Sequence, residues 1–538
     1  MVRMRPSPSV IQFTQLLNKL VQLKQYLVVI SLFKEMFSSR IPVDEYTMNV
    51  VINSFCFVRR VDFGFSILGI FFKSGYCPGV ITFNTLLRGL FSENRVGDAQ
   101  DLFKKIVNEK LCEPNEVMYN IVIDGLCKIG NTNTAIKILR FMERERCKPD
   151  VISYNTIIDN LCKDRMHNEA LAFLKEMVEK GLAPNVVTYT SLMHGLCNLG
   201  KWEETMKLFN EMLKFKISPN VFTFNILIDG LCKEGKIEEA EFIMKIMIEG
   251  GERPDAVTYG ALMDGYCLQV RIEEASRVFD RMVYVGVDPN IQIYNILING
   301  YCKKKKIDLA MQLFQKLPRK RLIPNVVTYS TILQGLFFVG RCVEAQELFN
   351  KMQQNGQKPN VYTHGIMLDG LTNNGHIDEA LSLLNAIENN EQHLSISWYN
   401  IIIHGLFKHG KFDEARALFN TLFLKGLDVN KVTFTTMIIG LCNGGLLKEA
   451  KELLAKMGEG EIASYPDEVA YNIIVQACLK GGEDADALMY LEEMDRRGFL
   501  LHASTFSNIL DLLPSKAKDH ILLKAIQKLN PIEKPASS

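Results

Sequence analysis

The sequence predicts an all-α fold, a solenoid of stacked antiparallel helical hairpins with a period of about 35 residues. Three observations support this prediction. One pattern recurs almost end to end, each copy holds two stretches with helical spacing of apolar residues, and a turn signal separates the two stretches. Each expected helix has only about three turns, which is marginal in water by itself. The copies must therefore bury their apolar faces against one another.

The segment Val221–Asp255 shows how one copy folds. Gly235 divides it into two helices, and Pro254 ends it because proline cannot continue a helix. The apolar residues of the first helix follow the spacing i, i+3, i+4, i+7 and so share one face: Phe224, Leu227, Ile228 and Leu231. Those of the second helix resume the same periodicity: Ile237, Ala240, Met244 and Met247.

The repeating pattern divides the chain into fourteen full copies and two partial ones. Residues 1–9 match the tail of an earlier copy, and residues 503–538 form a partial copy and a tail. The copy from Val80 carries one extra residue and the copy from Lys431 two, both of which a turn can absorb. The full copies are 10–44, 45–79, 80–115, 116–150, 151–185, 186–220, 221–255, 256–290, 291–325, 326–360, 361–395, 396–430, 431–467 and 468–502.

Three recurring residue types have a structural explanation. Glycine recurs in the turn between the two helices, where it adopts a left-handed conformation at little cost. Alanine recurs in the middle of the second helix and lets it approach the first. The glycines are Gly130, Gly200, Gly235, Gly340, Gly375, Gly410, Gly445 and Gly482. The alanines are Ala135, Ala170, Ala240, Ala275, Ala310, Ala345, Ala380, Ala415, Ala450 and Ala487. Methionine also recurs in the second helix, and we interpret it as packing.

Charge and hydropathy limit the functions that the protein can have. The 62 basic and 61 acidic residues nearly cancel, so nucleic-acid binding must depend on local placement of charge. No apolar run approaches the roughly 18 residues of a membrane-spanning helix. We therefore expect a soluble protein with no membrane partner.

Eight of the thirteen cysteines recur near the end of the first helix: Cys56, Cys127, Cys162, Cys197, Cys232, Cys267, Cys302 and Cys442. Neighbouring ones lie a whole copy apart, and no C-x-x-C pair is present. We expect small packing residues in a reducing compartment, with a disulfide or metal framework as the alternative.

The N-terminal segment Met1–Ser9 aligns with the last nine residues of a copy, so the chain is expected to begin inside a repeat. No Arg- and Ser-rich amphipathic presequence precedes it. Either targeting information is missing from this version of the chain, or the protein is not imported.

Enzymatic motifs are weak. Three segments, 195–201, 230–236 and 405–411, match most of a P-loop, but each follows a helix and lacks the Ser or Thr that holds magnesium. The nine histidines form no H-E-x-x-H, and the zinc deaminase signature is missing. We therefore expect no enzyme, no metal and no cofactor.

The copies open on TYN-x-LI-x-GLCK-x-G and close on EEA…M…G…P[DN]. Over residues 1–537 this pattern resembles the pentatricopeptide repeat family, specifically its P class. Tetratricopeptide repeats have a period of 34 and a W-x₂-L-G…Y signature that is absent here. The Asn-x-Leu-Ile-x-Gly-Leu-Cys-Lys style and the opening MRPSPSV are similar to the restorer-of-fertility-like branch of plants.

The resemblance implies a right-handed superhelix whose first helices line a concave surface and bind single-stranded RNA, one base per repeat. It also implies a monomer that acts on mitochondrial rather than chloroplast transcripts, in RNA processing, stability or expression, together with an RNA-processing protein.

In that family the fifth and the last residue of each repeat face the base edge. The pairs here are Thr14/Asp44, Asn49/Gly79, Asn84/Asn115, Asn120/Asp150, Asn155/Asn185, Thr190/Asn220, Asn225/Asp255, Gly260/Asn290, Asn295/Asn325, Ser330/Asn360, Gly365/Ser395, Asn400/Asn430, Thr435/Asp467 and Asn472/His502. Most are short donor–acceptor side chains, which suit a Watson–Crick edge. Asparagine at a helix start could instead cap free backbone amides, but the fifth residue lies in the second turn.

By the family's correspondence, Asn with Asp favours U, and Asn with Asn favours C or U. Thr or Ser with Asn favours A, and Thr with Asp favours G. The expected RNA is therefore 5′-G-?-Y-U-Y-A-U-?-Y-A-?-Y-G-?-3′, with Y a pyrimidine. Four repeats depart from the common pairs, at Gly79, Gly260, Gly365/Ser395 and His502.

The second residue of each repeat flanks the base in the family. The apolar ones here are Ile81, Val117, Ile152, Val187, Phe222, Val257, Val327 and Val432, with polar departures at Gln292, Ser397 and Ser504. Lysines that the family uses near phosphates end the first helix: Lys128, Lys163, Lys233, Lys303, Lys408 and Lys480. An ordinary solvated face is the alternative for these lysines. Packing is expected not to require Asn225, Asp255 or Phe222.

Two hypotheses about the function remain. The primary one is a sequence-specific binder of single-stranded RNA. The alternative is a protein-interaction scaffold that holds a peptide on the same surface without RNA.

Overall fold

The computed structural model describes residues 10–39, 41, 43–145, 147–390, 394–458 and 466–512, and every regular element in these ranges is helical. Residues 1–9 and 513–538, expected to be a repeat tail and most of the C-terminal segment, lie outside the described residues. The predicted all-α class is confirmed.

The first fourteen helices are α1 (Val10–Gln22), α2 (Tyr26–Ser38), α3 (Glu45–Phe57), α4 (Val61–Lys73), α5 (Val80–Ser92), α6 (Val96–Asn108), α7 (Glu116–Lys128), α8 (Thr132–Arg144), α9 (Val151–Lys163), α10 (His167–Glu179), α11 (Val186–Asn198), α12 (Trp202–Lys214), α13 (Val221–Lys233) and α14 (Ile237–Glu249). The others are α15 (Ala256–Leu268), α16 (Ile272–Tyr284), α17 (Ile291–Lys303), α18 (Ile307–Lys316), α19 (Val326–Phe338), α20 (Cys342–Gln354), α21 (Val361–Asn373), α22 (Ile377–Asn390), α23 (Ile396–Lys408), α24 (Phe412–Leu424), α25 (Lys431–Asn443), α26 (Leu447–Gly458), α27 (Glu468–Gly481), α28 (Asp484–Arg497) and α29 (Ala503–Leu512). A short 3₁₀ turn, Pro318–Lys320, follows α18.

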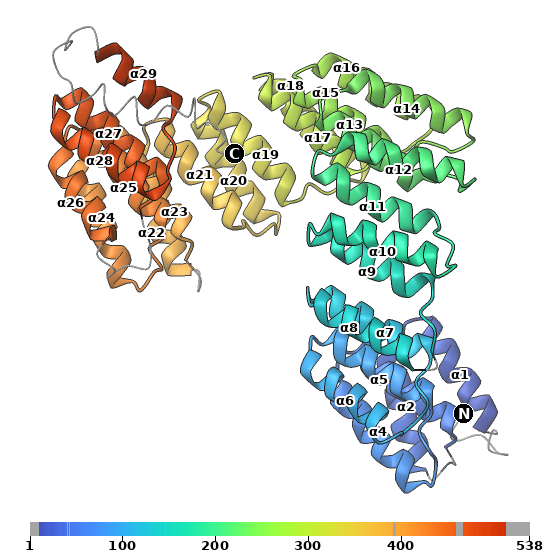
Figure 1. Cartoon of the computed structure of the whole chain (residues 1–538). Coiled ribbons are helices and arrows are strands. Elements are labelled where there is room, and N and C mark those ends of the chain that lie inside the picture. Colours follow the sequence, from blue (N-terminus) through green and yellow to red (C-terminus); the bar gives the residue numbers. More distant parts are fainter. Residues whose placement is uncertain are drawn as a thin grey trace, which may run out of the picture. The chain divides into compact units, whose positions relative to one another are not determined.

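The helices form hairpins, each an odd-numbered helix followed by an even-numbered one (Figure 1). Every odd-numbered helix begins at the residue where the sequence pattern begins a copy, from Val10 to Ala503. The repeat boundaries themselves stay a prediction. In the two longer copies the extra residues fall after the even-numbered helix, because three residues join the two helices of each of these copies, as they do in the copy 221–255.

The chain divides into two compact units, Met1–Gly265 and Tyr266–Ser538. In the first unit each odd-numbered helix packs on the next, from α1 to α13, and in the second unit from α17 to α29. Even-numbered helices contact odd-numbered neighbours, as α10 contacts α9 and α11. The odd-numbered helices thus form one layer of each unit.

The turn inside each full hairpin depends on a left-handed residue at position fifteen, counted from the first residue of the copy. In all fourteen copies its φ lies between +55° and +87°. Eight of these residues are the predicted glycines. The other six copies carry a side chain there, and one of them is the β-branched Val270 at φ +60°. A β-branched residue is strained in this conformation.

Small residues set the spacing between helices. The ten recurring alanines are all fully buried, as predicted, and so are the recurring methionines such as Met247. Along the odd-numbered layer, a glycine faces the cysteine of the preceding copy. A Cβ built on Gly265 would lie 2.7 Å from both the Cβ and Sγ of Cys232. Any larger residue would push the two helices apart.

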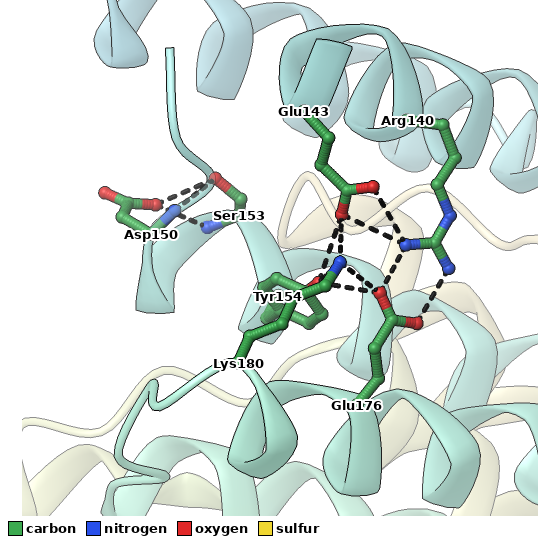
Figure 2. A network of polar contacts seen from close by, with 7 residues as sticks. All are labelled: Arg140, Glu143, Asp150, Ser153, Tyr154, Glu176 and Lys180. Carbon is green, nitrogen blue, oxygen red and sulfur yellow. Dashed lines mark hydrogen bonds and ion pairs between the residues drawn. The ribbon is translucent and has the colours of Figure 1, made fainter. Parts of the chain in front are cut away.

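A polar network joins the hairpins 116–150 and 151–185 (Figure 2). Glu176 of α10 accepts from Nη2 of Arg140 at 2.7 Å, from Nζ of Lys180 at 2.6 Å and from the Tyr154 hydroxyl at 2.8 Å. Hydrogen bonds from Arg140 hold the pKa of Glu176 down at about 2, despite partial burial that opposes the shift. The carboxylate therefore stays charged and links three helices.

Six of the eight recurring cysteines are buried, and the other two, Cys197 and Cys442, are partly buried. All thirteen are free thiols. Burial raises the pKa of Cys232 and Cys302 to about 12, so neither forms a thiolate near neutral pH. Among the described residues, no group of three or more His, Cys, Asp or Glu side chains is arranged to hold a metal ion. Nor does any helix in these ranges have the length and apolarity to cross a bilayer.

Candidate nucleic-acid interface

The last residue of a repeat is the N-cap of the following odd-numbered helix. Oδ1 of Asp150 accepts from the backbone N–H of Ser153 at 2.8 Å, and Oδ1 of Asn220 accepts from that of Thr223 at 3.0 Å. Such caps satisfy amides that a helix leaves free. This column therefore has a structural role that the sequence argument assigned to no residue. The other capping side chains are Asp44, Asn115, Asn185, Asp255, Asn290, Asn325, Asn360, Asn430 and Asp467.

Three of the expected fifth-and-last pairs are joined by a direct hydrogen bond. Nδ2 of the fifth residue donates to Oδ1 of the last residue at 3.1 Å, 3.1 Å and 3.2 Å in the pairs Asn120/Asp150, Asn155/Asn185 and Asn225/Asp255. The structure thus brings together side chains that lie thirty residues apart in sequence.

The expectation that packing does not need Asn225 and Asp255 is wrong. Asn225 is only 7% exposed, and Asp255 accepts from the backbone N–H groups of Val257 and Thr258. Burial alone would raise the pKa of Asp255, but the hydrogen bonds from Thr258 and Asn225 outweigh it and lower the pKa. Asp255 is therefore ionised and acts only as an acceptor.

Other fifth residues bond across to the third residue of the next repeat. These contacts are Thr14 to Thr47, Asn49 to Thr82, Thr190 to Thr223, Ser330 to Thr363 and Asn472 to Thr505. The sequence analysis did not single out this third position, although its Thr and Ser residues recur in one column.

A further group of fifth residues has a buried oxygen with no partner among the described residues. The atoms are Oδ1 of Asn84, Asn295 and Asn400 and Oγ1 of Thr435. Each is nearly inaccessible to water and lacks a hydrogen bond, an arrangement that native proteins rarely keep without a reason.

The repeats that depart from the expected pairs also depart in geometry. Gly79 and Ser395 precede their helices without a side-chain cap. Gly260 and Gly365 present no polar side chain at the fifth position. His502 lies 3.3 Å from Oε1 of Glu468 through Nε2.

The second residues lie on the surface. The eight apolar ones predicted from the sequence are between 46% and 73% exposed, with Phe222 the most exposed. Gln292, Ser397 and Ser504 are exposed as well. Four more apolar side chains occupy this column, and the sequence analysis missed them although the repeat register contains them: Ile11, Tyr46, Tyr362 and Val469.

The lysines near the end of the odd-numbered helices are partly neutralised. Lys128, Lys163 and Lys233 each pair with an aspartate one turn earlier, at 2.7 Å, 2.6 Å and 2.6 Å. Lys408 donates to Asn373 at 3.0 Å. Because Asp offsets half of the six charges, the expected positive line is weaker than the lysine column alone suggests.

Two of these lysines share a recess in the second unit. Lys303 and Lys408 line a cavity of about 560 Å³ together with Phe338 and Gln334. The recess offers cationic, aromatic and amide groups, which are the kinds of groups that contact phosphates and bases. Lys480, the sixth expected phosphate contact, lies in the last turn of α27.

Curated relatives match short parts of the chain. One pentatricopeptide repeat-containing protein of Arabidopsis thaliana, named mitochondrial, is 40% identical over 99 residues, which are 18% of this chain and 16% of that protein. A second from the same plant, also named mitochondrial, is 54% identical over 56 residues, 10% of each chain. The matched segments therefore span less than a fifth of these relatives.

A solved structure matches nearly the whole chain. The pentatricopeptide repeat protein PPR10 from maize superposes with a TM-score of 0.56 at 22% identity, covering 96% of this chain and 83% of PPR10. This likeness shows a shared fold. PPR10 in complex with an 18-nt psaJ RNA element matches with a TM-score of 0.45 at 21% identity, covering 98% and 81%.

Family models cover most of the sequence. One described as the PPR repeat family matches residues 114–163, 149–198, 184–233, 219–268, 289–338, 324–373 and 394–443. Two described as PPR repeat match residues 74–107 and residues 257–287, 362–391, 432–462 and 469–499. The first model alone spans more than half of the chain. The chain belongs to the pentatricopeptide repeat family.

Proposed function

We propose that this protein is a non-enzymatic, sequence-specific binder of single-stranded RNA that reads one base per repeat through its fifth and last residues. Within the family we place it in the P class and its restorer-of-fertility-like branch, on the motif style of the odd-numbered helices. The proposed target is 5′-G-?-Y-U-Y-A-U-?-Y-A-?-Y-G-?-3′.

The observation that carries the proposal is the set of fifth-position oxygens without partners. A buried acceptor without a hydrogen bond costs about 1–3 kcal/mol. Four such atoms recur at one position of the repeat, on Asn84, Asn295, Asn400 and Thr435. None of these side chains is held by a hydrogen bond to that oxygen among the described residues, so the side chain can turn and take the missing donor from a base edge. The repetition at one register favours a repetitive ligand, and RNA has one base per nucleotide.

The exposed second residues support the same ligand. Phe222, Ile152 and Val257 each leave more than half of their surface exposed, at 73%, 61% and 59%. They lie three positions before the fifth residue, so they border the polar column on the same helix. Apolar side chains beside polar edge-reading groups are typical of single-strand recognition, in which unstacked bases stack on the protein.

The alternative proposal is a scaffold that binds a peptide on this face, since exposed apolar side chains suit a peptide as well. The RNA-binding and scaffold proposals differ in the role they give to the polar fifth and last residues. A peptide has no base edges, so a scaffold gains nothing from the identity of the fifth and last residues. Base-specific effects of substitutions there therefore separate the two.

The direct test measures affinity for the proposed 14-nucleotide RNA and for a version in which the U and A positions are exchanged between purine and pyrimidine. We expect the exchanged RNA to bind at least tenfold more weakly, because a single mismatched contact costs about 1–3 kcal/mol. Equal affinity for both would overturn the code.

A second test changes one repeat. Replacing Asn225 with Thr and Asp255 with Asn creates a pair that the family's correspondence associates with A. The preferred base at the seventh position should move from U to A, while the other positions keep their preferences. The double substitution Asn120→Thr with Asp150→Asn is the matched control, because it should move only the fourth position.

We further propose that the protein acts on mitochondrial transcripts as a monomer, together with an RNA-processing protein. Several relatives carry mitochondrial in their names, although one is named chloroplastic. Fractionation of the native protein tests the compartment, and light scattering of the purified chain tests the monomer. Recovery in another compartment, or as a stable dimer, would contradict this part.

A further inference from the structure

In most repeats the third residue is Thr or Ser, and in several of them its hydroxyl hydrogen-bonds both to the residue that caps its own helix and to the fifth residue of the preceding repeat. Thr188, Thr258 and Thr328 hold this position in three repeats, and none of them is exposed. The predicted base-reading pairs consist of fifth and last residues, so the third position has no part in them. Thr188 and Thr258 nevertheless contact the fifth residue of the preceding repeat.

The capping box fixes the polarity of this hydroxyl. The backbone N–H of Asn185 donates to Oγ1 of Thr188 at 3.1 Å, and that of Asp255 donates to Oγ1 of Thr258 at 3.1 Å. A hydroxyl has only one hydrogen. Because its lone pair already serves the cap, that hydrogen is free to be donated to a neighbouring acceptor.

Two acceptors lie near this hydrogen, the capping side chain at 3.3 Å from Thr188 and 3.1 Å from Thr258, and the amide oxygen of the preceding repeat's fifth residue, which is closer in both cases. Oγ1 of Thr188 donates to Oδ1 of Asn155 at 2.6 Å, and Oγ1 of Thr258 donates to Oδ1 of Asn225 at 2.6 Å. On the other side of the same amide, Nδ2 of Asn155 donates to Asn185 at 3.1 Å. With Oδ1 held inward, the amide cannot turn over without losing both hydrogen bonds.

We infer that this third residue positions the base-reading amide and thereby decides between U and C in repeats whose fifth and last residues are both asparagine. The inference rests on the proposed RNA function. A held amide presents its remaining N–H, a donor, to the base. Uracil has the acceptor O4 at the place where cytosine has the N4 amino donor. The held amide therefore favours U, and an amide free to turn accepts either pyrimidine.

The chain contains a natural contrast. In the repeat 80–115 the fifth and last residues are Asn84 and Asn115, as in 151–185, but the next third residue is Met118. Methionine has no hydroxyl to donate, and Oδ1 of Asn84 has no partner among the residues that the structure describes. Copy 151–185 should therefore prefer U over C, and copy 80–115 should take both.

Thr328 provides a second contrast, because its hydroxyl bonds to the residue that caps its own helix rather than to the preceding fifth residue. Thr328 accepts from the backbone of Asn325 at 3.3 Å and donates to Oδ1 of the same residue at 3.0 Å. Within the described part of the chain, Oδ1 of Asn295, the preceding fifth residue, then has no partner. Thr328 caps its helix without holding the amide, which makes it a matched control for Thr188.

The experiment uses the whole chain and pairs of 14-nucleotide RNAs that differ only by U or C at the fifth base, opposite repeat 151–185. For the unsubstituted protein we expect U to bind about three- to tenfold more tightly, the value of one hydrogen bond. Thr188→Val, which removes only the hydroxyl, should bring the U/C ratio close to one. Thr188→Ser should restore it. Thr328→Val, read out at the ninth base, should leave its U/C ratio unchanged.

A variant that gains a base preference serves as a control, because misfolding cannot create a preference. Met118→Thr adds the missing donor beside Asn84, so the U/C ratio at the third base should rise to about three- to tenfold. Equal loss of affinity for U and C in Thr188→Val would show a structural role only and overturn the inference. So would sequence-specific binding with no U/C preference at the fifth base. Failure of the proposed function differs, because then even the exchanged RNA binds equally.

Discussion

Val270 is the residue whose replacement should stabilise the protein most directly through its backbone. It occupies the left-handed turn position at φ +60°, between α15 and α16. At the same position of the repeat 80–115 stands Asn94 at φ +61°. Asparagine tolerates this conformation, whereas a β-branched residue brings Cβ and the carbonyl too close. We therefore predict that Val270→Asn stabilises its hairpin.

The expected stabilisation by Val270→Asn is the difference between two opposing effects. Relief of the left-handed strain contributes about 1–2 kcal/mol. Val270 is 51% exposed, so the substitution gives up roughly half of a buried valine, about 0.7 kcal/mol. The free energy of local unfolding should rise by about 0.3–1.3 kcal/mol. The mirror substitution Asn94→Val introduces the strain at an exposed position and should lower it by about 1–2 kcal/mol.

Hydrogen exchange is the suitable assay, because repeat arrays open locally rather than all at once. Amides of α15 and α16 should exchange about two- to ninefold more slowly in Val270→Asn, and those of α5 and α6 faster in Asn94→Val. Unchanged exchange in both variants would refute the strain argument. Slower exchange in Asn94→Val would refute the assignment of the cost to the side chain.

The remaining predictions concern one buried histidine, one ion network and one exposed ring. His167 is 6% exposed and neither ring nitrogen has a partner in the described structure, so His167→Ile should raise the free energy of unfolding by about 1–3 kcal/mol in denaturant titration. Glu176, with its pKa lowered to about 2, stabilises the fold fully above pH 4.5 and loses that effect as pH falls toward 2. Glu176→Gln should thus lower stability by about 1 kcal/mol at pH 7, a value reduced for solvent screening, and by almost nothing at pH 2. Phe222→Ala should weaken RNA binding about 5- to 100-fold with little change in the unfolding midpoint, as measured by binding titration and thermal melting.

The features that could be predicted from the sequence alone are local and periodic. A period of about 35 residues, helical spacing of apolar residues and a glycine between them predicted each hairpin, and Gly235 adopts the expected left-handed turn at φ +77°. Such features depend on residues within one copy, where the physics of a short segment acts directly. The positions of the fifth, last and second residues followed from the same register.

The tertiary structure decided how those residues are held. Asp150 and Ser153 form a capping box whose residue types are visible in the sequence, but its role in the interface is not. Oδ1 of Asn155 is held by a hydrogen bond, whereas Oδ1 of Asn84 has no partner among the described residues. The difference depends on the third residue of the next copy, which reaches the amide only after the helices stack. A register of residue types cannot show that contact, because it forms between helices that are brought together by packing of their apolar faces.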